Sequence, residues 1–316
     1  MTYFQTVIYM VCLLAIVRYD KNLFYLEFLI ICTAFFVSLI VLSGVSSISS
    51  ALAGREDMFK NSITKVNPNS VGLLQSAAFL FQVIWLKKLR RNRHNIQRRR
   101  YLWLMIMVMF LMVMTLLVIL ISGSRKSMLA AVLTLVMMFI FSPKGKLFHK
   151  LMGITLSLVL IVAVFQIGQV FFNKVYIFRR FATFFNETSN TTRVNMIKEG
   201  FQLLGTSPFI GVGLGNYTYA SSFGTYSHNT VAEALATTGL LGAIIYFSTY
   251  LIIFSKLVLF TKHPKTKEFA YNGIILFGVL AFLSIGVIHF YEILSSLLFT
   301  YLIAGLVIYK DNVRYS

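Results

Sequence analysis

The sequence predicts an all-α fold, a polytopic membrane protein built as a helical bundle of about nine transmembrane helices. Hydrophobic residues make up 58% of the 316 residues and charged residues only 12%, whereas a soluble domain carries about 25% charge. Mean hydropathy is +0.78. Apolar runs of 15 to 25 residues recur along the chain, which is the length that crosses roughly 30 Å of hydrocarbon. Such continuous runs exclude a membrane barrel, whose strands alternate polar and apolar residues.

Nine apolar runs are predicted to span the membrane, and residues 1–316 form a single integral membrane domain. The first run has no basic segment before it and no small-residue cleavage site, so we expect a helix rather than a signal peptide. Asn69 or Ser70, just after Pro68, is expected to cap the third helix. The predicted spans are 3–17, 23–44, 70–86, 101–121, 127–141, 151–170, 230–254, 269–289 and 293–309.

Lysine and arginine are unequally divided between the two sides of these spans. The interval 87–100 holds eight of them, and 19 of the 29 fall on its side. Because cytoplasmic loops carry the basic excess, the sequence predicts a multi-pass protein of the cell membrane with its N-terminus outside and its C-terminus in the cytoplasm. The basic run is then a topology anchor that can touch anionic lipid. It lacks interleaved aromatics and a recognisable module, so nucleic acid is not an expected partner.

Metal and disulfide chemistry are not indicated. Cys12 and Cys32 both lie in apolar runs, where a cysteine is usually a small buried apolar residue. The five histidines are scattered without the spacing of a metal site. We therefore predict no metal and no cofactor.

The longest polar interval, 171–229, is predicted to be a large, partly helical extracytoplasmic loop. An ordered loop of this length is usually functional. A helix is expected at about 192–204, capped by Thr191 or Thr192 and ended by Gly205 and the Ser-Pro pair that follows. Its apolar stripe should pack against the bundle or the membrane surface. The stripe consists of Val194, Ile197, Phe201 and Leu204.

Four arginines on the outer side are candidate ligands for an anion. Arg125 lies between two spans joined by almost no loop, and Arg193 begins the loop helix. Arg179 and Arg180 are weaker candidates next to aromatic residues. A guanidinium is a rigid fork of donors that fits phosphate oxygens. The alternatives are a snorkelling side chain for Arg125 and a solvated charge for Arg193.

His228 and Asn229 stand where the chain re-enters the membrane, and Asn229, like Glu233 after it, is a candidate substrate-binding residue. A neutral imidazole there could accept a proton from a hydroxyl group, although a lone interfacial histidine is often structural. The glycine-rich segment 211–215 follows no strand, so it predicts a tight turn that approaches a ligand or a helix rather than a nucleotide site. Glu27 and Glu292, in or beside spans, are functional suspects without an obvious partner.

These motifs, in this order, resemble the bacterial O-antigen ligase and polymerase superfamily. The similarity covers about residues 60–250. Its most specific part is the spacing of the glycine turn, the His-Asn pair and the later Gly-Leu-Leu-Gly. The motifs are Asn-Pro-Asn at 67–69, Ser124-Arg125, Arg193 in a long outer loop, Gly-Val-Gly-Leu-Gly at 211–215, His228-Asn229 and Thr-Gly-Leu-Leu-Gly at 238–242.

The resemblance implies a metal-independent glycosyltransferase that works on undecaprenyl-pyrophosphate-linked glycan at the outer membrane face. Arg125 and Arg193 match the family arginines thought to hold the pyrophosphate, and His228 matches the histidine proposed to activate the acceptor hydroxyl. Members often carry an acid where this chain has Thr237, whereas Glu233 lies four residues earlier and could assist His228. Members usually have more spans upstream, which predicts a short form with a reduced lipid groove.

The expected activity is polymerisation of repeat units for a capsule, exopolysaccharide or O-antigen. Transfer of a finished glycan to another acceptor, as by a ligase, uses the same donor and stays open. Flippase and chain-length regulator proteins are candidate partners, beside the lipid bilayer itself. A lipid-linked oligosaccharide transporter or a non-catalytic scaffold is the rival from another class, although no internal repeat favours a transporter.

Overall fold

The computed structural model describes residues 10–12, 14–15, 22–44, 67–141, 151, 155 and 188–314, with side chains from 191 to 310 in the last range. All regular secondary structure in these ranges is helical, which confirms the predicted all-α class. Most of the predicted spans 3–17 and 151–170 lies outside the described residues, as do Arg179 and Arg180.

Within the described ranges, five helices are long and apolar enough to cross a membrane, so the expected total of nine remains a prediction. The predicted spans 127–141 and 269–289 correspond to helices of 16 and 17 residues, which are shorter than these five. The helices belong to two compact units, residues 24–183 and residues 184–316 with 1–23. The five candidate spans are Phe24–Ser43, Pro68–Arg91, Arg98–Ser122, Thr230–Phe260 and Ile293–Lys310.

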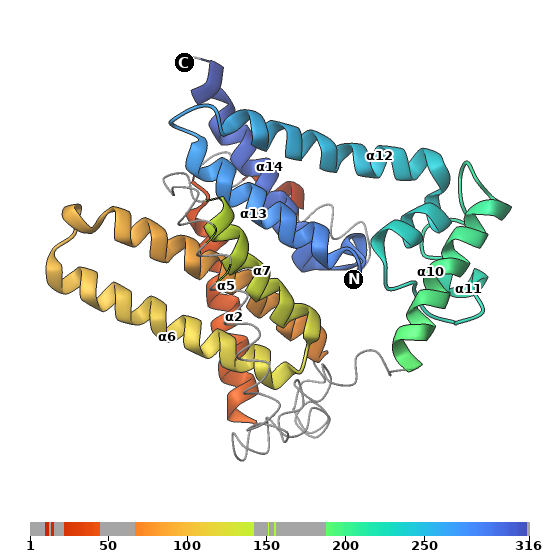
Figure 1. The fold of residues 1–316 in the computed structure, drawn as a ribbon, viewed down its shortest axis with the longest axis horizontal. Helices are drawn as coiled ribbons and strands as arrows, with labels where there is room; N and C mark the ends of the chain where they lie inside the picture. Colours follow the sequence, from red (N-terminus) through yellow and green to blue (C-terminus); the bar gives the residue numbers. More distant parts are fainter. Residues whose placement is uncertain are drawn as a thin grey trace. The chain divides into compact units, whose positions relative to one another are not determined.

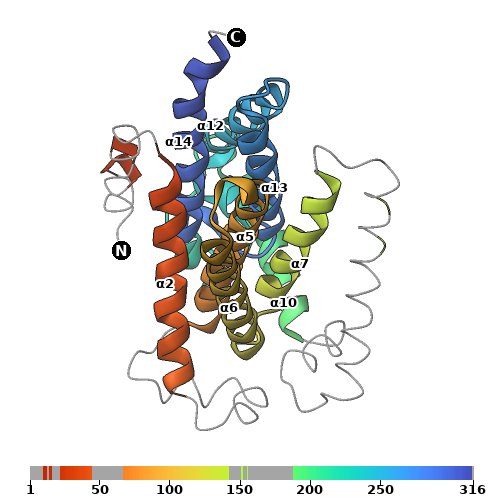
Figure 2. The same cartoon turned by 90° about the vertical axis from the view of Figure 1, so that its left-hand side faces the viewer.

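In the unit 24–183, helix α5 is the element against which the others pack (Figures 1 and 2). Of the most apolar 18-residue window of α5, 72% is buried, against 33% in α2 and 28% in α6. The outer faces of α2 and α6 are therefore available to lipid. The elements are α2 (Phe24–Ser43), α5 (Pro68–Arg91), the short η1 (Arg93–Asn95), α6 (Arg98–Ser122) and α7 (Arg125–Ile140).

Buried polar side chains on α5 reach each of its three neighbours. Gln75 donates to the Ala34 carbonyl of α2 at 2.8 Å, and Gln82 donates to the Thr115 hydroxyl of α6 at 2.9 Å. The Ser76 hydroxyl lies 2.9 Å from a backbone carbonyl of α7. Lipid supplies little hydrophobic drive between helices, so such hydrogen bonds and close packing hold them together.

The ends of α5 differ from the prediction. Asn67, not Asn69 or Ser70, is the N-cap, and its side chain accepts the Asn69 amide at 2.9 Å. Pro68 then occupies the first helical position, where its missing N–H costs nothing. The helix also runs five residues past the predicted end, to Arg91, because the basic residues that mark the membrane edge are good helix formers.

In the other unit, α12 is the longest helix and is flanked by the rest (Figure 1). Helices α13 and α14 pack along α12, while α10 and α11 lie against its first part. The elements are α10 (Thr188–Thr206), α11 (Tyr217–Ala220), α12 (Thr230–Phe260), α13 (Lys267–Leu283), η2 (His289–Tyr291) and α14 (Ile293–Arg314).

The loop helix α10 begins four residues earlier than predicted, so Thr191 and Thr192 are inside it rather than capping it, and Gly205 is also helical. Val194 and Phe201 of its predicted stripe are about half exposed, so the stripe does not pack on α12, and its position at the membrane surface stays a prediction. The face against α12 carries Met196 and Gly200 instead, as small residues allow close helix approach.

The predicted span 269–289 is wrong in its last six residues, because α13 ends at Leu283. The chain then bends to meet the start of α12. The Ser284 carbonyl accepts the Thr230 amide at 2.9 Å, and the Thr230 hydroxyl donates to the Val287 carbonyl at 2.6 Å. The α13–α14 connection is therefore part of the support for the α12 N-terminus.

Helix α12 is broken at Gly239, whose φ of +63° and ψ of −168° are essentially restricted to glycine. The break leaves the Ala236 and Thr237 carbonyls and the Leu240 and Leu241 amides without helical partners. The segment 208–213 replaces all four bonds, at 2.8 to 3.2 Å. The sequence predicted that the glycine-rich turn approaches either a ligand or a helix, and in the structure it approaches helix α12.

Candidate functional site at the start of α12

The N-terminus of α12 is built by Asn229. Its side-chain oxygen accepts the amides of Val231 and Ala232, both at 2.9 Å, so Asn229 is the N-cap. The side-chain amide nitrogen of Asn229 lies 3.4 Å from the Ile285 carbonyl oxygen. Asn229 was predicted to bind substrate; in the structure its side chain is engaged in capping.

His228 precedes this cap with a φ of +58°, and among the described residues no other non-glycine residue has a positive φ. A left-handed conformation costs an ordinary residue roughly 1–2 kcal/mol. Neighbouring contacts hold it: the Ser227 hydroxyl donates to the Asn229 carbonyl at 2.9 Å, and the Ser227 amide donates to Glu233 at 2.7 Å. Such strain is often found at functional positions.

Glu233 is a buried carboxylate that accepts hydrogen bonds from two neighbouring segments. Its side chain is 1% exposed, and one carboxylate oxygen accepts the Ser227 amide while the other accepts the Tyr291 hydroxyl at 3.0 Å. A carboxylate in the first turn of a helix is also favoured by the helix dipole. Glu233 therefore connects α12, the loop before His228 and η2, while its assistance to His228 stays a prediction.

Tyr226 contacts His228 and lies within electrostatic range of Arg193 and Glu292. Its ring centre lies 4.2 Å from that of His228, with the planes inclined by 55°. The pKa of the Tyr226 hydroxyl is raised above its ordinary value. Partial burial is the largest cause, and the Glu292 and Glu233 carboxylates add to it, whereas the Arg193 guanidinium opposes it. Arg193 and Glu292 are thus within electrostatic range of a ring that contacts His228. We call Arg193, Tyr226, His228, Glu233 and Glu292 the α12 site.

Arg193 is half-buried near the start of α10, and α10 is fixed by two further contacts. The buried Tyr217 donates its hydroxyl to the Met196 carbonyl at 2.5 Å. Glu199 accepts the amide and hydroxyl of Ser222 at 2.7 and 3.0 Å. The helix that carries Arg193 is therefore attached to the chain leading to Tyr226 and His228.

Arg125 belongs to the unit 24–183, where it is the first residue of α7 and only 7% exposed. A left-handed Gly123 ends α6 just before it. The turn packs on Gly72 of α5, where an added Cβ would lie 2.6 Å from the Ser127 hydroxyl. Its burial does not fit a snorkelling residue, whose guanidinium stays in water. Its part in anion binding stays a prediction, as do those of Arg179 and Arg180.

Sequence reasoning missed Tyr226 and Tyr291. Both lie beside residues that it had marked, two positions before His228 and directly before Glu292. Aromatic residues near a candidate base and a candidate acid were the available signal. His289, by contrast, is a structural histidine with both ring nitrogens 2.8 Å from partners, Ser295 and the Leu280 carbonyl.

Fold and site together define a multi-pass membrane protein with a charged and aromatic cluster where a helix begins. Residues 110–247 match the family model described as O-antigen ligase. The matched region includes Arg125 and most of the α12 site, and the match supports the resemblance to the O-antigen ligase and polymerase superfamily, whose members are glycosyltransferase-like membrane enzymes. The match lies inside the predicted 60–250. No curated protein matches the chain.

Proposed function

We propose that this chain is a polymerase that joins undecaprenyl-pyrophosphate-linked oligosaccharide repeat units at the outer face of the cell membrane. The product would be a surface polysaccharide such as a capsule, exopolysaccharide or O-antigen. The observation that carries the proposal is that Tyr226, whose ring contacts His228, lies within electrostatic range of Arg193, in the region that matches the family. The family supplies the reaction class, membrane glycan transfer.

The chemistry needs one base and one source of positive charge. A hydroxyl oxygen of the acceptor glycan attacks C1 of the donor sugar, and the bond from C1 to the pyrophosphate oxygen breaks. The hydroxyl proton goes to the neutral imidazole of His228. The negative charge that grows on the pyrophosphate is stabilised by Arg193, while anion binding by Arg125, Arg179 and Arg180 stays an expectation from the resemblance.

The buried polar residues have positioning roles in this proposal. Glu233 holds the Ser227 amide, and Asn229 caps the helix directly after His228. A base fixed in this way keeps its orientation between turnovers, which is what makes proximity effective. Glu233 and Asn229 thus act on His228 rather than on the glycan.

Exposed apolar residues on the same unit support a lipid-linked donor. The segment that joins the α12 break presents Phe209 and Ile210, which are 65% and 72% exposed, and α12 itself presents Leu241 and Ile244. Such residues are stable only against lipid or an apolar partner. A polyprenyl chain in the bilayer would keep its pyrophosphate at this membrane boundary.

The broken helix α12 is a feature shared with transporters, whose unwound backbone binds ions or substrate at the membrane midplane. Here the backbone groups freed at Gly239 are bonded to the segment 208–213. They are therefore not available for a transported ligand. This observation favours the enzyme over the transporter.

A ligase activity is the second candidate, because the matched family model is described as O-antigen ligase. The reconstituted protein should be incubated with polyprenyl-pyrophosphate-linked oligosaccharide extracted from the parent cells. A ladder of repeats supports the polymerase, and a single transfer to another acceptor supports the ligase. An unchanged donor pool, with the protein shown to be folded, would contradict both. Because guanidinium groups supply the charge, a chelator of divalent cations should leave the ladder intact.

A further inference from the structure

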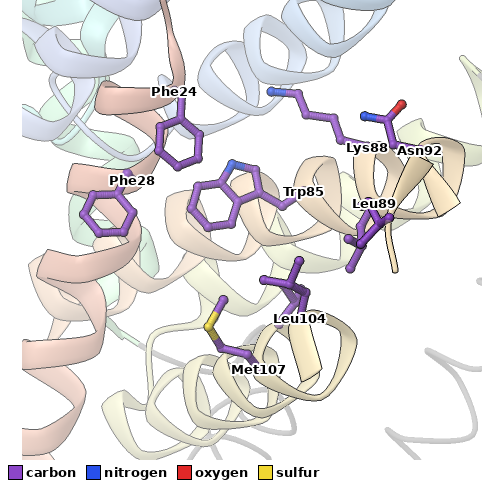
Figure 3. Close-up of a pocket in the computed structure, with 10 residues that line it drawn as sticks. Phe24, Phe28, Trp85, Lys88, Leu89, Asn92, Leu104 and Met107 are labelled. Carbon is purple, nitrogen blue, oxygen red and sulfur yellow. The ribbon is translucent and has the colours of Figure 1, made fainter. Parts of the chain in front are cut away.

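The unit 24–183 contains a cavity of about 350 Å³ that has no part in the proposed glycan transfer (Figure 3). Its size falls in the range of roughly 300–1,000 Å³ that is typical of small-molecule sites. It lies between α2, α5 and α6, at the end of α5 that carries the basic residues. Its walls are mostly apolar and include Phe24, Phe28, Trp85, Leu104 and Met107.

The aromatic side of the cavity, Phe24 and Trp85, is positioned by the buried Glu27 carboxylate. Phe24 stacks on Trp85 with ring centres 5.3 Å apart and planes inclined by 7°. The Trp85 indole N–H donates to the buried Glu27 carboxylate at 2.6 Å. Lys88 pairs with the same carboxylate, 2.9 Å from both oxygens. Glu27, for which the sequence offered no obvious partner, is thus bound by both Trp85 and Lys88.

The polar groups of the cavity lie on one side, where Lys88 and Asn92 line it (Figure 3). Lys88, which pairs with Glu27, is one of eight Lys and Arg residues in the interval 87–100. Glu27 is also the sole acid in the described parts of this unit, 24–44 and 67–141. The apolar cavity therefore lies beside a segment with a large excess of positive charge.

One face of helix α6 carries both an arginine of the basic segment and residues of the cavity wall. Arg100, Leu104 and Met107 are spaced i, i+4 and i+7, so Arg100 lies one turn beyond the cavity wall on the same side of the helix. Arg98 and Leu102 are spaced i, i+4 on another face, and both are exposed. The chain thus offers matched control positions only two residues away.

We propose that this cavity binds one acyl chain of an anionic phospholipid, whose phosphate lies among the cations at the end of α5. Charge selects this occupant: a zwitterionic lipid would bring a second cation into a positive cluster, whereas a phosphatidylglycerol headgroup brings only the anion. The positive-inside bias places this lipid in the cytoplasmic leaflet. The site is separate in its residues from the α12 site.

The test is native mass spectrometry of the purified full chain in detergent, with added phosphatidylglycerol or phosphatidylcholine. Phosphatidylglycerol should give at least fivefold more one-lipid adduct at equal concentration. Leu104→Trp, which fills the cavity, should lower that adduct severalfold, whereas Leu102→Trp should not. Arg100→Gln should reduce the preference for phosphatidylglycerol more than Arg98→Gln does.

Two results would overturn the proposal. Equal adducts with both lipids would make the cavity an unselective lipid groove. A Leu104→Trp protein that keeps the wild-type phosphatidylglycerol adduct would place the lipid elsewhere. Circular dichroism and size-exclusion elution of each variant show whether it is folded. Should Leu104→Trp fail to fold, Leu104→Phe and the arginine pair decide the outcome by the same measurement.

Discussion

Gly211 and Gly239 approach each other so closely that neither has room for a side chain. A Cβ atom on Gly211 would lie 2.6 Å from the Gly239 nitrogen, and one on Gly239 would collide with the backbone of Phe209. Both residues have positive φ, +67° and +63°. This contact allows the segment 208–213 to bond the broken ends of α12, and it fixes the polar loop to the helix that carries Glu233.

Replacing either glycine by alanine should destabilise the protein. The positive-φ backbone alone costs alanine about 1–3 kcal/mol, and the steric overlap adds to this cost. Gly205→Ala is the control, since Gly205 is helical and has nothing within 4 Å of an added Cβ. Thermal unfolding in detergent should show lower midpoints for Gly211→Ala and Gly239→Ala only. A wild-type midpoint for Gly239→Ala would show that the close approach is not needed.

His228 can be replaced in a way that separates catalysis from folding. Glycine accepts the φ of +58° more readily than histidine, so His228→Gly should keep or raise the unfolding midpoint. It removes the imidazole, and glycan transfer should fall by about 10²- to 10⁴-fold if His228 is the base. The assay is the rate of ladder formation at neutral pH. A rate within a few-fold of wild type would assign His228 a structural role.

Arg193→Lys tests whether geometry, not charge alone, binds the pyrophosphate. An ammonium group keeps the positive charge but lacks the two-pronged donor set, so polymer formation should fall markedly. Lys198→Gln, an exposed change on the same helix, should leave polymer formation unaltered. Gel analysis of lipid-linked product gives the chain-length distribution. If Arg193→Lys gives the wild-type distribution, Arg193 is not the phosphate clamp.

Stability should fall in mild acid because of His289. Burial lowers the pKa of His289 to about 4, from an ordinary value of about 6.5. Above pH 6.5 the ring is neutral in both states; as the pH falls from 6.5 to 4, only the unfolded chain takes up the proton. The folded state therefore loses up to about 3 kcal/mol across this window.

The measurement is the unfolding midpoint in detergent at pH 7.5, 5.5 and 4.5. His289→Gln removes the titrating group, so its midpoint should change less over this range, even if it is lower throughout. Equal pH dependence in wild type and His289→Gln would exclude His289 as the cause.

The residues of the α12 site were only partly predictable. Arg193, His228 and Glu233 could be named from motif order, because charged residues at membrane boundaries stand out in so apolar a chain. Tyr226 and Tyr291 could not, because their role depends on which ring and which carboxylate they meet. The face of α10 that packs on α12 was not predictable for a related reason: close packing selected the small Gly200 over the larger apolar residues.

The sequence by itself determined the all-α membrane class, the positions of most long helices and the family resemblance. Those follow from local composition, since a run of about 20 apolar residues has few other stable states than a helix in lipid. Only the tertiary structure decided that α12 breaks at Gly239, that Glu27 pairs with Lys88 and that Glu233 holds the loop before His228. These depend on partners distant in sequence or on backbone bonds, which hydropathy does not report.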